Sequence, residues 1–154
     1  MSVESRIKEL GIVLPNSPTP VANYVPVVRT GNLIYLSGVG PTAKKDGSEF
    51  KGKLGIDLSV EDGYEAARLT GINIISRLKG YLTDLEKVSR IVKVLSMVNA
   101  SPDFFDPPAV SNGCSDLLVE VFGEKGKHAR SAIGVASLPG NWPIEIEVIA
   151  EITD

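Results

Sequence analysis

Apolar residues recur at helical spacing in two long segments of this 154-residue chain. The first follows Ser59, which forms a capping-box signal with Asp62, and its apolar stripe predicts a helix with one buried face. That stripe contains Ala66, Leu69, Ile72, Ile75, Leu78 and Leu82. The second segment opens at Pro107 and Pro108 and closes at Gly123, as helices with an N-terminal proline and a C-terminal glycine do. It directs Val110, Cys114, Leu117, Leu118 and Val121 toward the core.

A shorter helix is predicted at the N-terminus. Ser2 to Leu10 has helical character and Gly11 ends it, and the turn-rich stretch from Pro15 to Pro20 then resembles an arm. We therefore expect residues 1–20 to form an N-terminal helix and arm, and residues 21–154 to form a single domain.

Alternating and continuous apolar runs predict the strands. Tyr24 to Val28 and Leu33 to Leu36 flank a Thr-Gly-Asn turn, which predicts a hairpin with Gly31 or Asn32 at a positive φ angle. Ile91 to Val98 follows the first long helix as a strand with apolar residues on both faces. Lys44 to Lys53 is polar and contains glycine, so we expect a mobile loop near the end of the second strand.

The last twenty-five residues read as a second β-hairpin. Arg130 opens an apolar run that turns through Pro139, Gly140 and Asn141 into IEIEVIAEI. Alternation predicts that one side of the first strand carries Arg130, Ala132, Gly134 and Ala136. One side of the second strand carries Glu145, Glu147, Ile149 and Glu151. The predicted register places these two sides on one surface.

Such a surface would be concave, because the residues that follow Arg130 on the same side of the strand are all small. A guanidinium at one end and carboxylates at the other suit the binding of a small carboxylate and the activation of water beside it. This prediction depends on register, since a slip of one residue would send the arginine and the glutamates to opposite faces.

The predicted element order is ββαβαββ, an α+β fold with a mixed sheet and two helices packed on one face. The strands also contain apolar or small residues expected to face away from those helices, namely Val92, Val94, Ala132 and Ala136. Self-association is the simplest way to bury that second face, so we expect a homo-oligomer.

Composition excludes several functions. The net charge is −3 and the isoelectric point is near 5.2, so a nucleic-acid partner has little electrostatic support. No secretory signal or run of about eighteen apolar residues occurs, which predicts a soluble, cytoplasmic protein without a membrane partner. One cysteine and one histidine cannot build a disulfide or a thiolate–imidazole metal cluster, and nothing supports a metal site made only of carboxylates.

Several reactive side chains have simpler interpretations. Cys114 lies on an apolar helical stripe and is expected to be a core thiol. His128 is interpreted as a loop histidine, and the pair Asp103 and Asp106 as part of a turn and helix entry. Trp142 is a candidate interface anchor. From residue type alone, Arg130 is as readily a solvated strand residue as a ligand clamp, and Tyr24 is more often a packed strand aromatic.

Four stretches in a fixed order resemble the Rid/YjgF family of reactive-intermediate deaminases, also described as the endoribonuclease L-PSP family. They are ANYVPVVRTGNLIYLSG (22–38), Asn112, HARSAIGVASLP (128–139) and IEIEVIA (144–150). The resemblance covers Val21 to the C-terminus. It implies a chorismate-mutase-like subunit, a homotrimer with a site in each intersubunit cleft, and no cofactor.

The resemblance also implies an activity, the hydrolysis of enamines and imines such as 2-aminoacrylate, 2-aminocrotonate and 2-iminopropanoate to 2-keto acids and ammonia. Arg130 matches the family arginine that pairs with the substrate carboxylate, and Glu145 matches the glutamate that directs water. Five further matching positions are implied to line the cleft: Tyr24, Ser37, Gly38, Asn112 and Ala132.

Two departures from the family pattern are evident. Pro26 stands where many members have glutamine, and Ala132 stands where cysteine is frequent, so no thiol chemistry is expected in the cleft. Two other functions stay open: a non-catalytic protein that binds small carboxylates or 2-keto acids through Arg130, and, with less support, an endoribonuclease.

Overall fold

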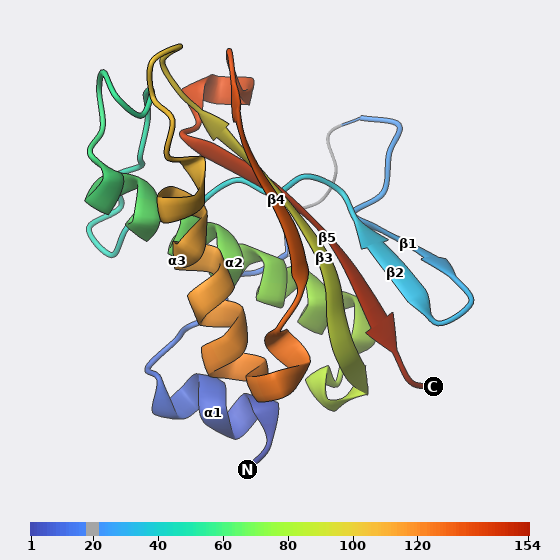
Figure 1. Cartoon of the computed structure of the whole chain (residues 1–154). Helices are drawn as coiled ribbons and strands as arrows, with labels where there is room; N and C mark the ends of the chain where they lie inside the picture. Colours follow the sequence, from blue (N-terminus) through green and yellow to red (C-terminus); the bar gives the residue numbers. More distant parts are fainter. Residues whose placement is uncertain (18–21) are drawn as a thin grey trace.

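One five-stranded mixed sheet, covered on one side by two long helices, forms the body of the molecule (Figure 1). The computed structural model describes residues 1–17 and 22–154. The strand order is β1-β2-β5-β3-β4, and among these described strands the β3–β4 pair is parallel and the other pairs are antiparallel. The expected α+β fold with helices on one face is confirmed. Within the described ranges, no helix is long and apolar enough to cross a bilayer.

Both long helices form where the apolar stripes predict them. Helix α2 spans Val60–Leu82, and Ser59 and Asp62 complete the expected capping box at its start. Helix α3 spans Pro107–Phe122, with the Asp106 side chain accepting from Ala109 N and Gly123 at its end. The two helices pack against each other and cover one side of the sheet (Figure 1).

The first hairpin consists of β1 (Val27–Thr30) and β2 (Leu33–Leu36), joined by a turn in which Gly31 has φ +58°. β1 begins three residues later than the expected start at Tyr24. Pro26 has no backbone N–H to donate, and its carbonyl accepts from Ser37 N at 3.0 Å where the ladder ends.

The predicted C-terminal hairpin is wrong. β4 (Ala129–Val135) and β5 (Ile144–Ile152) are not neighbours, because β3 (Val88–Asn99) lies between them. The cause is α3, which connects β3 to β4 and so forms a crossover that places β4 parallel to β3. β5 then pairs with the other edge of β3. The turn itself was located correctly, since the short helix η3 (Pro139–Asn141) has Gly140 and Asn141 at positive φ.

This topology separates Arg130 from the glutamates. Val94 pairs with both Arg130 and Val148, and Val148 is buried beneath the helices, so Arg130 lies on the helix side of the sheet. Glu145 alternates with buried Ile144 and Ile146 and lies on the opposite face. The prediction of one shared surface is therefore wrong. Val94 is also buried on the helix side rather than facing away from it.

The face without helices carries a different apolar set from the expected one. Met97 pairs with Glu145 and Ile133, and Leu95 pairs with Glu147. Ala132 was expected on this face, but it pairs with buried Ser96 and so lies on the helix side. The second face is thus a mixture of apolar side chains and carboxylates, and its burial by self-association stays a prediction.

The loop expected to be mobile is attached to the rest of the protein at its C-terminal end. Phe50 is buried, and Gly52 N donates to Asn141 O at 2.9 Å. Lys53 Nζ donates to Asn99 Oδ1 at 2.7 Å, and Leu54 N donates to Asn99 O. These contacts tie the loop to η3 and to the end of β3.

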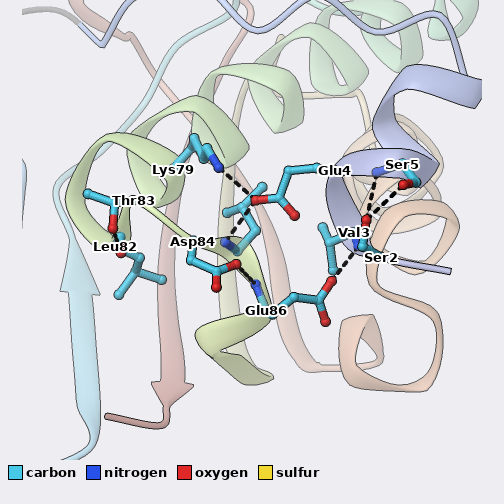
Figure 2. Close-up of polar contacts among 10 residues, drawn as sticks. Ser2, Val3, Glu4, Ser5, Lys79, Leu82, Thr83, Asp84 and Glu86 are labelled. Carbon is cyan, nitrogen blue, oxygen red and sulfur yellow. Dashed lines mark hydrogen bonds and ion pairs between the residues drawn. The ribbon is translucent and has the colours of Figure 1, made fainter.

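The N-terminal helix α1 (Val3–Glu9) docks beside the turn that follows α2, as Figure 2 shows. Ser2 caps α1, and Val3 and Ile7 are buried. Glu4 Oε1 accepts from Lys79 Nζ at 2.7 Å and from Leu85 N at 3.2 Å. Leu85 opens the short helix η1 (Leu85–Lys87). The predicted arm that follows α1 lies partly outside the described residues.

Replacing Glu4 with alanine should reduce stability by about 1–2 kcal/mol, because two hydrogen bonds are lost and one leaves a partly buried N–H unpaired. Thermal unfolding would measure the loss. Glu9→Ala is the matched control, since Glu9 makes only an exposed ion pair with Arg6 on the same helix. Equal melting temperatures for the two variants would show that Glu4 does not hold α1 in place.

Candidate functional site

Arg130 is held by two side chains of α3. Its Nη1 group donates to Asn112 Oδ1 at 2.9 Å and to Ser115 Oγ at 3.1 Å. Asn112 and Ser115 are three residues apart, so they lie on the same face of the helix. We call Arg130, Asn112 and Ser115 the arginine cluster. Within residues 1–17 and 22–154, no hydrogen bond uses Arg130 Nε or Nη2, so one edge of the guanidinium is available to a ligand.

The free edge of Arg130 has the geometry for a carboxylate. Nε–H and Nη2–H are parallel donors, which match the two oxygens of a carboxylate in a bidentate pair. Ala132 lies two residues further along β4, on the same side of the strand as Arg130. Its side chain is a single methyl group, so it adds little bulk to that side of the strand.

Ser115 also contacts the single histidine of the chain. Its Oγ lies 2.9 Å from His128 Nε2, and His128 Nδ1 lies 2.6 Å from Gly126 O. Burial lowers the pKa of His128, the hydrogen bond to Gly126 O opposes that shift, and the nearby positive charge of Arg130 adds to it. The interpretation of His128 as a simple loop histidine is incomplete. Sequence reasoning missed Ser115, although its spacing of three residues from Asn112 was a usable signal.

Glu145 is part of a second group on the other side of the sheet. A Cβ atom built on Gly38 would lie 2.9 Å from Glu145 Cδ, so the backbone after β2 packs directly against this carboxylate. Ser37 precedes Gly38, and its Oγ donates to Val25 O at 2.6 Å. We call Glu145, Gly38 and Ser37 the glutamate cluster. It brings together three of the residues that the sequence singled out.

The Glu145 carboxyl group is suited to accept a proton. Burial, followed by the charge of Glu147, raises its pKa above 4.5. A carboxylate with a raised pKa is a stronger base than an exposed one. Glu147 and Glu151 follow Glu145 on the same face of β5. Both Glu147 and Glu151 are exposed, as expected for solvent-facing strand residues.

Tyr24 belongs to neither cluster. Its side chain is about half exposed, and it lies just before Val25, whose carbonyl accepts from Ser37. The Tyr24 hydroxyl is near enough to Arg77 of α2 to oppose the lowering of the Arg77 pKa that burial causes. In a single chain, therefore, Tyr24 lies one residue before the Val25 carbonyl that Ser37 contacts, but it hydrogen-bonds to none of the described members of the glutamate cluster.

Other reactive residues have the simpler roles that the sequence indicated. Cys114 is fully buried, and burial raises the pKa of its thiol to about 12. Asp106 caps α3, and Asp103 accepts from Ser101 Oγ. Trp142, the candidate interface anchor, packs over Gly40 within this subunit, where a Cβ atom would lie 2.6 Å from the indole ring, and its role at an interface stays a prediction. Among the described side chains, no three of His, Cys, Asp and Glu are grouped as a metal site.

The subunit has an α+β fold of the chorismate-mutase-like class, with a mixed five-stranded sheet and a pair of helices on one face. The model of the YjgF/chorismate mutase-like family, whose description also mentions endoribonuclease, matches residues 4–152. The chain belongs to this family. The match begins earlier than the resemblance expected from Val21 onward, and it includes most of α1.

Three relatives illustrate the range of the family. Protein TCP17 of Trypanosoma cruzi is 40% identical, and the alignment covers 99% of this chain and 95% of the relative. A 2-iminobutanoate/2-iminopropanoate deaminase of Dermatophagoides farinae is 30% identical, with 92% and 94% covered. The crystal structure of Atu1372 from Agrobacterium tumefaciens, a protein of unknown function, is 41% identical with a TM-score of 0.89, and 98% of this chain and 92% of that chain are covered.

Proposed function

We propose that this protein hydrolyses enamines and imines of the 2-aminoacrylate or 2-aminocrotonate type to 2-keto acids and ammonia, without a cofactor. The observation that carries the proposal is the anchored guanidinium of Arg130, with its bidentate edge free. The relative named as an iminobutanoate and iminopropanoate deaminase supports the same reaction class. Each of these substrates has a carboxylate next to the carbon that water attacks.

The proposed chemistry uses the two clusters in sequence. Arg130 binds the substrate carboxylate and so fixes the adjacent imine carbon. An enamine first tautomerises to the imine, its terminal carbon taking a proton from water as the nitrogen gives one up. Glu145 accepts a proton from water as the water oxygen bonds to the imine carbon, and passes it to the nitrogen, which gives a carbinolamine. Glu145 then carries the hydroxyl proton to the amine as the C–N bond breaks, so that ammonia leaves and the carbon keeps the oxygen as a keto group.

Arg130 and Glu145 lie on opposite faces of the sheet, so we infer that one site takes the arginine cluster from one copy and the glutamate cluster from a neighbour. The second face of the sheet, with Leu95 and Met97 among carboxylates, is the surface through which copies associate. A homotrimer with three clefts fits this proposal. Tyr24, near the glutamate cluster, then lines the cleft with Ser37, Gly38, Asn112 and Ala132.

Glu145→Gln should lower the release of 2-keto acid from freshly generated 2-aminoacrylate by roughly 10²-fold, the usual contribution of a general base. Glu151→Gln is the matched control, because Glu151 is an exposed glutamate on the same face of β5 and does not contribute to the raised pKa of Glu145. The wild-type rate should fall as the pH drops through a value above 4.5, since protonated Glu145 cannot accept a proton. Equal rates for Glu145→Gln and the control variant would show that Glu145 is not the general base.

A second function is favoured by one specific feature. The arginine cluster does not include Glu145, so the free Nε and Nη2 edge of Arg130 can bind a 2-keto acid without turnover. A protein that binds 2-oxobutanoate but does not accelerate imine hydrolysis would be a carboxylate sensor or regulator. Endoribonuclease activity has less support, because the net charge of −3 does not favour RNA.

A further inference from the structure

The contacts of Ser115 and His128 form a series of hydrogen bonds, the hydrogen-bond chain, with Arg130 at one end. From one end to the other, it contains the Gly126 carbonyl, the two ring nitrogens of His128, the Ser115 hydroxyl and the Nη1 group of Arg130. Its three spacings are 2.6, 2.9 and 3.1 Å. The chain joins the short helix η2 (Gly123–Gly126) to α3 and to β4.

Only one arrangement of protons satisfies every link while the imidazole is neutral. The Gly126 carbonyl can only accept, so His128 Nδ1 must carry the proton. Nε2 is then an acceptor and takes the Ser115 O–H, which leaves the lone pairs of Ser115 Oγ for the Arg130 N–H. All hydrogen bonds therefore run in one direction, from Arg130 to Gly126.

We propose that Ser115 is a positioning residue for Arg130, and that neutral His128, protonated at Nδ1, holds the Ser115 hydroxyl in the orientation that accepts from the guanidinium. The inference deepens the proposed function, because it concerns how the carboxylate-binding arginine is fixed. With Nη1 engaged by Asn112 and Ser115, the guanidinium cannot rotate freely, and its Nε and Nη2 edge keeps one direction.

The charges around His128 favour its neutral form. Arg130 on β4 adds positive charge close to the ring, and burial acts in the same direction. Arg90 of β3, Glu124 of η2 and Lys127 line the surface around the ring, and Glu124 forms a 2.7 Å ion pair with Lys127. The one carboxylate in this group is thus already paired with a lysine.

The Ser115–His128 pair also has the spacing of a serine nucleophile and its base, but its surroundings do not suit that chemistry. Ser115 lies inside α3, where neighbouring backbone N–H groups are used by the helix and cannot stabilise an oxyanion. The Ser115 oxygen also accepts from Arg130, so its lone pair faces a cation rather than an open cleft. The positioning role accounts for both contacts.

Two experiments on the full-length protein test the proposal. Because the chain has one histidine, its ¹⁵N resonances report His128 alone. We expect neutral imidazole with the proton on Nδ1 in the wild type, and a rise in the His128 pKa in Arg130→Met, which removes the nearby charge. A wild-type ring protonated at Nε2 would overturn the proposed direction of the chain.

The second experiment measures the binding of 2-oxobutanoate, a product of the proposed reaction. Ser115→Ala should weaken it roughly five- to tenfold, the effect of one lost hydrogen bond, and Ser115→Thr should restore it by returning a hydroxyl. In turnover, Ser115→Ala should raise KM and leave kcat nearly unchanged. Ser111→Ala, one turn earlier on α3, should bind like the wild type, because the Ser111 hydroxyl contacts Pro107 and Ser96 instead.

These readouts separate the positioning proposal from the deaminase proposal. Binding without turnover would reject the deaminase and leave the role of Ser115 measurable through affinity. If the protein does not bind 2-oxobutanoate, the tautomer and pKa of His128 still test whether the hydrogen bonds from Arg130 through Ser115 to His128 form as proposed. Wild-type affinity in Ser115→Ala would overturn the positioning role.

Discussion

Arg130→Lys should lower kcat/KM for 2-aminoacrylate by roughly 100-fold, because a lysine cannot make the bidentate pair and loses two charge-assisted hydrogen bonds to the carboxylate. Lysine keeps the positive charge, so the loss would measure geometry rather than net electrostatics. The Arg130→Lys substitution would also disturb the hydrogen bonds to Asn112 and Ser115, which Nη1 of the guanidinium donates.

The measurement is 2-keto acid release at several substrate concentrations, with the oligomeric state of each variant checked by light scattering. Arg90→Lys is the matched control, since Arg90 is an exposed arginine on the neighbouring strand β3. If Arg130→Lys keeps the wild-type kcat/KM, Arg130 does not bind the substrate carboxylate.

Gly113→Ala should have the largest effect on stability, with a loss of about 3 kcal/mol or more. Gly113 lies in α3 where it crosses α2, and a Cβ atom there would lie 2.0 Å from the Tyr64 carbonyl oxygen and 3.1 Å from Arg68 N. Both contacts are with helix backbone, so the clash is relieved only if the two helices move apart. That movement would weaken the packing that covers the sheet.

Thermal or urea unfolding would measure the Gly113→Ala effect. Gly134→Ala is the matched control, because the nearest atom to a Cβ at that position is Ala100 Cβ at an ordinary 3.7 Å. We expect Gly134→Ala to unfold within about 0.5 kcal/mol of the wild type. Equal stability of the two variants would contradict the close approach of α2 and α3.

The helices were predictable because their signals are local. The Ser59 capping box, the prolines at the start of α3 and the glycine at its end act within a few residues, and the structure has all of them. The β1–β2 hairpin was predictable for the same reason, since Gly31 supplies the positive φ that its turn requires.

Strand order was not predictable from the same patterns. The alternation in β4 and β5 describes each strand correctly, but it does not say whether a third strand lies between them. That outcome depends on the α3 crossover and on β3, which has partners on both edges. Because the prediction placed Arg130 and Glu145 on one surface, the wrong pairing produced the wrong geometry of the site.

Two pairs of neighbours among the predicted site residues lie together, but their arrangement about the sheet was not predictable. Asn112 lies beside Arg130, and Gly38 lies beside Glu145, so the motif matches grouped residues that are neighbours in space. The separation of the two groups by the sheet follows only from the topology. The spacing of Ser115 three residues from Asn112 was the only sequence signal for its place in the site, whereas the role of His128 needed side-chain geometry.

A mixing experiment tests most directly whether the site is built from two copies. Arg130→Ala and Glu145→Gln are each inactive on this account, but they retain different clusters. Subunits of the two variants are dissociated, mixed in equal amounts and reassembled, and 2-keto acid release from 2-aminoacrylate is compared with that of the wild type treated identically. Random mixing in a closed ring should restore about one quarter of the wild-type activity, because that share of interfaces joins an intact Arg130 to an intact Glu145. Mixed oligomers that stay as inactive as the separate variants, beside an active wild type, would contradict a site shared between copies.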